Sequence, residues 1–352
     1  MNVLSGQLLD WVDERLHVRP LIEMARHKAV PVHRGSVFYY AGGVCLFLFI
    51  LQVASGILLL MYYRVGADSS YESVRYISAK VSFGWLIRSV HSWGANIMIF
   101  FVLTHMFSVF LMKAFRNPRE LTWMSGCVLL GLSMAFGFSG YLLPWNELAF
   151  FATKVGTDII GQVPLVGHWM LKIVRGGDEV TGATLSRFFG LHVAVLPALL
   201  SVTIGLHLTF VQIQGMAEVR EAKKTMPFFP NFFLRDAMLW LVVLNAVAIL
   251  SVFFPWELGK KAEALSSAPA GIKPEWYFLS QYQFLKLLPP RILLIPGELW
   301  GIMVLGTTGG LLFLTPFWEK ALPEERKEIV VRLLGWGGLA VLLAMTLWGY
   351  LS

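Results

Sequence analysis

The chain has 352 residues, of which 56% are hydrophobic and only 14% are charged. A soluble globular domain carries about 25% charged residues, so this composition excludes that class and indicates a polytopic membrane protein. The net charge of +7 would suit a nucleic-acid-binding protein, but the basic residues form no run longer than two. We therefore attribute the positive charge to topology and lipid contact, and predict no nucleic-acid partner.

The apolar pattern predicts an all-α fold with about seven transmembrane helices, at about 37–62, 90–112, 121–144, 188–213, 237–255, 291–317 and 329–350. Residues 1–36 form a helical pattern too polar to span, which predicts a segment along the membrane surface. Segment 146–187 is interrupted by charges, proline and glycine, and predicts short interfacial helices. The charged connector 214–236 separates a four-span domain, 37–213, from a three-span C-terminal domain, 237–352.

Two further features bear on topology and redox state. Lys and Arg are denser on the N-terminal side of the predicted spans, which favours a cytoplasmic N-terminus. Cys45 and Cys127 lie far apart, each inside an apolar span. We interpret them as small core residues and not as a disulfide or a thiolate metal site.

Two histidines, His91 and His105, lie fourteen residues apart in the second predicted span. An α-helix rises ~1.5 Å and turns ~100° per residue, so these side chains share a face to within ~40° and lie ~21 Å apart along the axis. His192 and His207 repeat the pattern in the fourth span with a spacing of fifteen, which gives ~22 Å and ~60° of drift. Two helices therefore present two inward histidines each, at two matching depths.

Four histidines at two depths predict two haem sites. A single histidine in a span is more often a satisfied polar residue facing the bundle interior, but ionisable groups in a membrane need partners. A six-coordinate haem iron takes one axial nitrogen on each side of the ring. The second and fourth spans run parallel, so we predict that His91 pairs with His192, and His105 with His207, as iron ligands.

Four glycines support this prediction. Gly42 and Gly56 in the first span, and Gly126 and Gly140 in the third, are also fourteen residues apart. Glycine lets a backbone approach a flat ring closely, although small residues also occur where helices simply pack together. Arg88 at the start of the second span is a candidate partner for a haem propionate, or simply the positively charged end of a span.

The loop before the sixth span places a carboxylate, Glu275, between a proline and two aromatic residues. Partial desolvation at the membrane surface would raise the pKa of Glu275 towards values useful for proton transfer. From the residues alone, the simpler interpretation of an ordinary loop carboxylate beside interfacial aromatics stays open.

Besides the four histidines, the distinctive segments are Phe83-Gly84-Trp85-Leu86-Ile87-Arg88-Ser89-Val90-His91, Pro118-Arg119-Glu120-Leu121, Gly140-Tyr141-Leu142-Leu143-Pro144-Trp145 and Pro274-Glu275-Trp276-Tyr277. In combination, and over nearly the whole chain, they resemble cytochrome b of the Rieske/cytochrome b complexes, the quinol:cytochrome c or plastocyanin oxidoreductases. The resemblance implies quinol oxidation at the outer face and electron transfer through two b haems to an inner quinone site, the Q-cycle, coupled to proton translocation.

The resemblance also implies residue roles. His91 and His192 would bind the low-potential haem near the outer face, and His105 and His207 the high-potential haem near the cytoplasmic face.

At the quinol site, the resemblance implies that Glu275 accepts a proton from quinol. Tyr141 and Tyr277 would be further catalytic residues, and Pro274, Glu275, Trp276 and Tyr277 would form the quinol pocket. The segment 146–172 would help to shape it.

The implied partners are a Rieske iron–sulfur protein, a c-type cytochrome, quinone and membrane lipid, in a complex that forms a homodimer. The implied location is the bacterial cytoplasmic (inner) membrane.

Within the family, the spacing of His192 and His207 and the end after seven spans resemble the photosynthetic branch, with its four-span cytochrome and three-span subunit IV fused here. In that branch a cysteine just before the Gly-Gly of the first span holds a third, covalently attached haem. Tyr40 occupies that position in this chain, and Cys45 falls five residues later. We therefore do not predict a third haem.

Two alternatives have different chemistry. A dihaem membrane anchor of a dehydrogenase or hydrogenase would reduce quinone at one site, but would need no equivalent of residues 214–352. A transporter would use the inward histidines to relay protons without haem.

Overall fold

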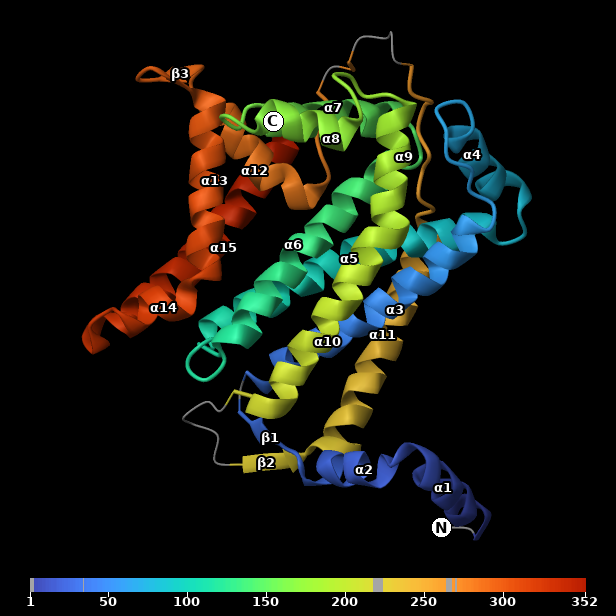
Figure 1. Cartoon of the computed structure of the whole chain (residues 1–352), viewed down its shortest axis with the longest axis vertical. Coiled ribbons are helices and arrows are strands. Elements are labelled where there is room, and N and C mark those ends of the chain that lie inside the picture. The colour runs from blue at the N-terminus through green and yellow to red at the C-terminus, as the bar shows by residue number, and fades with distance from the viewer. Residues whose placement is uncertain (1–2, 34, 218–223, 264–267, 270) are drawn as a thin grey trace.

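The computed structural model of the protein describes residues 3–33, 35–217, 224–263, 268–269 and 271–352 (Figure 1). Helices make up most of this chain: α1 (Val3–Leu16), α2 (Val18–His27), α3 (Tyr40–Leu60), α4 (Ser70–Lys80), α5 (Gly84–Leu111), α6 (Glu120–Leu142), α7 (Glu147–Gly161), α8 (Gly167–Arg175), α9 (Gly182–Gly190), α10 (Leu196–Gln214), α11 (Phe233–Phe253), α12 (Trp276–Leu287), α13 (Gly297–Phe313), α14 (Thr315–Lys320) and α15 (Glu324–Leu351). A 3-10 turn, Ser36–Tyr39, precedes α3, and π turns, Leu191–Val195 and Phe228–Phe232, precede α10 and α11. The strands are β1 (Ala29–Val32), β2 (Lys224–Pro227), β3 (Arg291–Ile292) and β4 (Ile295–Pro296).

By length and composition, six helical segments of the described chain can cross a membrane: Ser36–Leu60, Gly84–Leu111, Glu120–Leu142, Gly182–Gln214, Phe228–Phe253 and Glu324–Leu351. The apolar helix α13 has 17 residues, which is the lower limit for a span. These helices confirm the predicted all-α membrane fold with about seven spans. The sixth span begins at Gly297 and not near 291, because β3 and β4 form a short antiparallel hairpin before it.

Four spans begin at least five residues earlier than the apolar pattern predicted, at Gly84, Gly182, Phe228 and Glu324. In the first three, a charged residue near the start is satisfied locally. Arg88 of α5 donates to two loop carbonyls, and Arg187 of α9 donates to a carbonyl of its own helix. Asp236 of α11 accepts a hydrogen bond from Trp240 one turn later, at 3.1 Å. Charges that find partners in this way do not end a helix.

The centre of the molecule is a bundle of four helices. Helix α3 packs on α5, α6 packs on α10, and α5 joins the two pairs through α6. These helices run side by side through the middle of Figure 1. Helix α11 covers α3 and α5, while α13 and α15 pack against α6 and α5 from the C-terminal part. The bundle therefore has partners on two sides and free apolar faces elsewhere.

Different short elements close the two ends of the bundle (Figure 1). Helices α7, α8 and α9 lie together at one end, as predicted for segment 146–187. At the other end lie α1, α2 and the antiparallel ladder of β1 and β2, in which Ala29 pairs with Pro227 and Val32 with Lys224. This ladder joins the N-terminal segment to the connector. The middle of the predicted connector, 218–223, lies outside the described residues.

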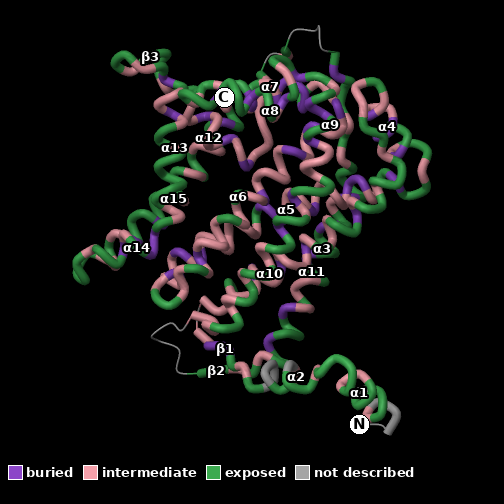
Figure 2. Tube along the Cα trace, in the orientation of Figure 1, coloured by how far each residue is buried: buried purple, intermediate pink, exposed green. Residues whose placement is uncertain are grey.

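Buried side chains form three clusters along the bundle (Figure 2). The middle cluster consists of Val44, Leu48, Met98, Leu200, Val243 and Val247. The cluster beneath α7 and α9 includes Leu142, Trp145, Phe150, Leu185 and Phe188, and the cluster at the opposite end consists of Phe110, Phe115, Trp123 and Val331. Met98 lies halfway between His91 and His105 in sequence, so the middle cluster separates the two histidine levels. Both cysteines are free thiols.

Ion pairs hold the loop after α5 to the C-terminal helices. Arg116 donates to the Glu319 carboxylate, with 3.0 Å between Nε and Oε1, and the Glu319 side chain is only 4% exposed. Lys113 pairs with Glu328 of α15. The buried Glu319 carboxylate cannot be stabilised by water and needs Arg116 to offset its charge. The exposed Glu328 carboxylate is solvated and needs no single partner.

We expect Arg116→Ala to destabilise the protein by ~3–5 kcal/mol, because it leaves a buried carboxylate unpaired. The measurement is the thermal unfolding midpoint of the purified protein in detergent. Arg332→Ala is the control: Arg332 is 71% exposed and 3.8 Å from Glu328, so its loss should change stability by less than ~1 kcal/mol. Equal effects of the two substitutions would contradict the argument.

Candidate functional site

Helix α3 lies against both histidines of α5 through its two glycines. A Cβ atom at Gly42 would be 3.2 Å from Cε1 of His105, and one at Gly56 would be 3.3 Å from Cε1 of His91. Both distances are tighter than ordinary van der Waals contact, so each histidine ring rests on bare backbone. The equal spacing of the glycine pair and the histidine pair reflects this direct contact.

Helix α6 makes the corresponding contacts with the other two histidines. A Cβ atom at Gly126 would be 3.4 Å from Cε1 of His207, and one at Gly140 would be 2.6 Å from Cε1 of His192. The two closely packed helix pairs of the bundle thus each hold two histidines. Every predicted glycine meets one predicted ligand.

A π turn explains why His192 and His207 are fifteen residues apart and not fourteen. His192 lies in the π turn Leu191–Val195, where the Leu196 N–H donates to the Leu191 carbonyl. Pro197 follows directly and has no N–H for a regular α-helical hydrogen bond. A π turn inserts one residue into a helix, so the extra residue is absorbed and His192 faces Gly140.

The first predicted ligand pair has the separation that a shared iron requires. The ring centroids of His91 and His192 are 6.4 Å apart, with an interplanar angle of 72°. Two imidazoles on opposite faces of one metal, each with a metal–nitrogen bond of ~2 Å, have centroids roughly 6 Å apart.

Three serines set the proton position on three of the histidines. Each accepts or donates one hydrogen bond with Nδ1 of a histidine: Ser55 with His91 at 2.9 Å, Ser125 with His207 at 2.9 Å and Ser139 with His192 at 3.1 Å. Each hydroxyl also donates to a carbonyl of its own helix. The serine oxygen must therefore accept from Nδ1–H, which leaves the Nε2 lone pair free for a metal. These residues fit a haem iron, and the sequence signal that we did not use is the repeated dipeptide Ser-Gly.

Arg88, predicted as a candidate partner for a haem propionate, donates hydrogen bonds to two backbone carbonyls of a distant loop. Its Nη1 donates to the Trp256 carbonyl at 2.7 Å and its Nη2 to the Glu257 carbonyl at 2.8 Å. The Trp256 N–H in turn donates to the Ser89 hydroxyl. Arg88 thus fastens the start of α5 to the segment that follows α11, and a contact with haem stays a prediction.

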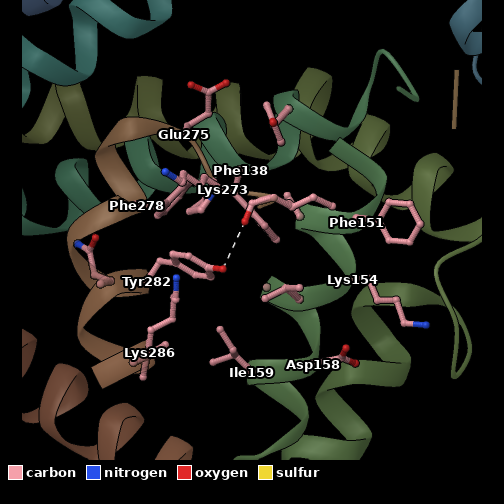
Figure 3. A pocket seen from close by; sticks show the side chains of 18 of the residues that line it. Phe138, Phe151, Lys154, Asp158, Ile159, Lys273, Glu275, Phe278, Tyr282 and Lys286 are labelled. Atoms are coloured by element: carbon pink, nitrogen blue, oxygen red, sulfur yellow. Dashed lines mark hydrogen bonds between the residues drawn. The ribbon is translucent and has the colours of Figure 1, made fainter. Parts of the chain in front are cut away.

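A second candidate site is a cavity of about 1000 Å³ between α6, α7 and α12 (Figure 3). Its lining includes Phe138, Tyr141, Phe151, Lys154, Asp158, Ile159, Lys273, Pro274, Glu275, Phe278, Tyr282 and Lys286. Figure 3 shows the Glu275 carboxylate at one end of the cavity, directed away from Tyr282 and Lys286. A mostly apolar cavity with a few polar groups is typical of a small-molecule site.

The structure divides the four residues of the predicted quinol pocket into two pairs. Pro274 and Glu275 line the cavity, together with the predicted Tyr141 of α6. Trp276 and Tyr277 lie outside its described lining and hold the loop to the bundle. The indole of Trp276 donates to Asn96 of α5 at 2.8 Å.

Tyr277 packs against α6 at a glycine. A Cβ atom at Gly137 would be 2.8 Å from the Tyr277 hydroxyl oxygen. Burial raises the pKa of Glu275, and burial together with the nearby Glu275 charge raises the pKa of Tyr277. Glu275 occupies the position before α12 but makes no capping hydrogen bond with its side chain.

Segment 146–172, which contains α7, was expected to shape the pocket, but sequence reasoning named none of its lining residues and missed the contribution of α12. On α7, the lining residues Phe151, Lys154 and Asp158 follow one another at intervals of three and four, and Ile159 follows the lining residue Val155 by four. This helical period on a short interfacial segment is the signal that would have identified them.

Comparison with known proteins identifies the family. Residues 27–215 match the family model described as Cytochrome b/b6/petB, and residues 261–351 match the model described as Cytochrome b(C-terminal)/b6/petD. This chain belongs to the cytochrome b family. It is therefore an integral membrane protein of electron transport, and the family implies b-type haem.

Three similar proteins show how far the likeness extends. The chain is 46% identical over 344 residues to the cytochrome b subunit of a cytochrome bc complex from Chlorobaculum thiosulfatiphilum, covering 96% of this chain and 79% of that protein. It is 40% identical to cytochrome b6 of Synechococcus sp. (strain JA-3-3Ab), over 60% of this chain and 98% of cytochrome b6. A solved structure titled hyperthermophilic respiratory Complex III matches with a TM-score of 0.83 and 30% identity, over 97% of this chain and 91% of that one. By these likenesses, the chain is a cytochrome b of the bc type.

We expect Gly140→Ala to displace the ring of His192, because the new methyl group would lie 2.6 Å from Cε1. The purified cytochrome b should then lose about half of its haem, measured from the reduced-minus-oxidised spectrum and the extracted haem per protein. Gly131→Ala on the same helix is the control, because none of the described residues comes within 4 Å of its Cβ position. Full haem content in Gly140→Ala would show that this contact does not position His192.

Proposed function

We propose that this chain is the dihaem cytochrome b subunit of a quinol:cytochrome c oxidoreductase. It oxidises quinol at the outer membrane face and passes electrons through two b haems to a quinone site at the inner face. The observation that carries this proposal is the contact of each of the four histidines with one glycine, at two levels of a single bundle.

His91 and His192 would hold the low-potential haem, and His105 and His207 the high-potential haem. Both pairs lie inside the bundle, and the middle apolar cluster separates the two levels. When bound, the two haems supply one-electron redox chemistry at two depths of the membrane. The glycines admit the histidine rings, and the Nε2 lone pairs of the four histidines would hold the haem irons.

The cavity beside Glu275 would bind quinol. Oxidation of one quinol to quinone releases two electrons and two protons, so the site needs a proton acceptor. Glu275 would take one proton, since its pKa is raised by burial towards the working pH. Tyr141 shares the cavity and would help to orient the quinol ring, while Tyr277 holds the loop in place.

The two electrons would take different routes. One would pass to a Rieske iron–sulfur protein and then to a c-type cytochrome. The other would pass by way of the two haems to the inner quinone. Two such electrons, from the oxidation of two quinols, would reduce one quinone to quinol with the uptake of two protons. Proton release outside and uptake inside would couple the reaction to proton translocation.

The proposal also assigns parts of the chain. Residues 37–213 would be the dihaem domain, 214–236 the cytoplasmic connector, and 237–352 the C-terminal domain with the quinol loop. We place the homodimeric complex in the bacterial cytoplasmic membrane with the N-terminus inside. The cavity and the N-terminal helices lie at opposite ends of the bundle, which supports this orientation (Figure 1).

The alternative functions lack support. A dihaem anchor would not need a C-terminal domain, yet residues 261–351 match the C-terminal cytochrome b family model. A proton-relaying transporter would not need rings resting on glycine with Nε2 left free.

We expect His105→Ala to remove one of two b haems and to leave the other spectrally intact, because each haem has its own pair of ligands. A redox titration of the α band in the purified complex measures this. His168→Ala on α8, far from the bundle interior, is the control and should retain both components. Loss of both components from stable His105→Ala protein would argue against separate sites.

We expect Glu275→Gln to slow quinol oxidation by ~10²-fold, the lower end of general-base contributions, with unchanged haem content. In the wild type, the rate should fall as the pH drops through the raised pKa of Glu275, above the ordinary value of 4.5, because the protonated carboxyl cannot accept a proton. Glu275→Gln should lack this acid limb. Glu298→Gln, an exposed carboxylate outside this cavity, is the control. Wild-type turnover and pH profile in Glu275→Gln would exclude the proton role.

A further inference from the structure

One of the four histidines differs from the others in its hydrogen bonding. Nδ1 of His105 is buried and has no hydrogen-bond partner in the described part of the chain. The other three histidines each bond to a serine through Nδ1. Carbonyls of Gln52, Thr122 and Phe136 lie beside the same three rings as well. His105 therefore lacks a type of partner that its three counterparts share.

The sequence shows the cause of this difference. The three serines stand immediately before Gly56, Gly126 and Gly140, and Ala41 stands immediately before Gly42. Each of these residues directly precedes a glycine that contacts a histidine ring. The side chain at this position is a hydroxyl-bearing serine at three sites and an alanine methyl group at the fourth. Ala41 is 4% exposed, so the position belongs to the bundle interior.

A hydrogen bond from Nδ1–H changes what Nε2 offers to a metal. An acceptor at Nδ1 makes the imidazole more basic and therefore a stronger electron donor to the iron. Stronger donation stabilises the ferric state, and the one-electron reduction potential falls. Each serine O–H donates a hydrogen bond to a backbone carbonyl, so the serine oxygen accepts from Nδ1–H and the two hydrogen bonds strengthen each other.

The two histidine pairs differ in how many of their Nδ1 atoms bond to a serine. Both His91 and His192 have a serine, whereas only His207 has one in the second pair. Resting on the proposed two-haem function, we infer that Ser55, Ser125 and Ser139 are positioning residues that lower haem potential, and that Ala41 keeps the potential of the His105–His207 haem high. The difference makes electron transfer from the first level to the second favourable.

Ala41→Ser tests the inference directly, in a redox titration of the purified complex. The new hydroxyl should lower the midpoint potential of the high-potential haem and leave the low-potential haem unchanged. One hydrogen bond changes an equilibrium by about two- to tenfold, and tenfold equals ~59 mV for one electron. Ser139→Ala should raise the low-potential midpoint instead, and Ser139→Thr should restore it.

Ser133→Ala is the matched control. Ser133 is a buried serine of α6 that bonds to its own helix at Leu129, and none of the described residues pairs it with a histidine. It should shift neither potential. If Ala41→Ser does not assemble, the Ser139 variants give the same test at the other haem.

The outcomes separate this inference from the proposed function. Two b haems whose midpoints do not respond to Ala41→Ser, or to Ser139→Ala where Ala41→Ser does not assemble, would overturn the inference alone. A wild-type titration without two b-haem components would overturn the proposed function as well. Equal shifts in the Ser133→Ala control would also overturn the inference, because they would show a general packing effect.

Discussion

The structure depends on one constraint, the burial of four imidazoles inside an apolar helix bundle. A polar nitrogen away from water is costly without a partner, and at three of the four rings the protein satisfies one nitrogen and leaves the other free for a ligand. The serines satisfy Nδ1 at three rings, and the glycines give the rings room against bare backbone. The π turn at Leu191–Val195 serves the same constraint, because it turns His192 towards Gly140.

In the proposed function, the two candidate sites would carry out different chemistry at different depths: electron transfer at the histidines and proton transfer at Glu275. The two levels of histidines lie within the spans, where apolar surroundings disfavour charged side chains and favour neutral imidazoles as ligands. Glu275 lies in a loop at the end of the bundle, beside a cavity that α7 and α12 complete. A carboxylate there can exchange protons with the outside, which one inside the bundle could not do readily. The proposed division, with proton transfer at the end of the bundle and electron transfer in its middle, is consistent with where water can reach.

Much of this arrangement was predictable because it rests on local patterns. Apolar length identified the spans, and helical period identified the shared face of His91 and His105. The equal spacing of the glycines is also local, so their role beside the rings could be predicted. Other features depend on contacts between segments distant in sequence. The carbonyl partners of Arg88 are 168 and 169 residues away, and the β1–β2 ladder joins residues nearly 200 apart, which no periodicity indicates.

By itself, the sequence determined the fold class, the two levels of histidines and the resemblance to cytochrome b, because each depends on the identity and spacing of residues along one helix or loop. Only the tertiary structure decided which glycine meets which histidine, that Trp276 and Tyr277 support the loop while Glu275 lines the cavity, and that His105 has no partner for Nδ1. These features depend on how neighbouring helices rotate and approach each other. Whether the residue before each glycine is serine or alanine matters only because a histidine ring from another helix lies beside that position.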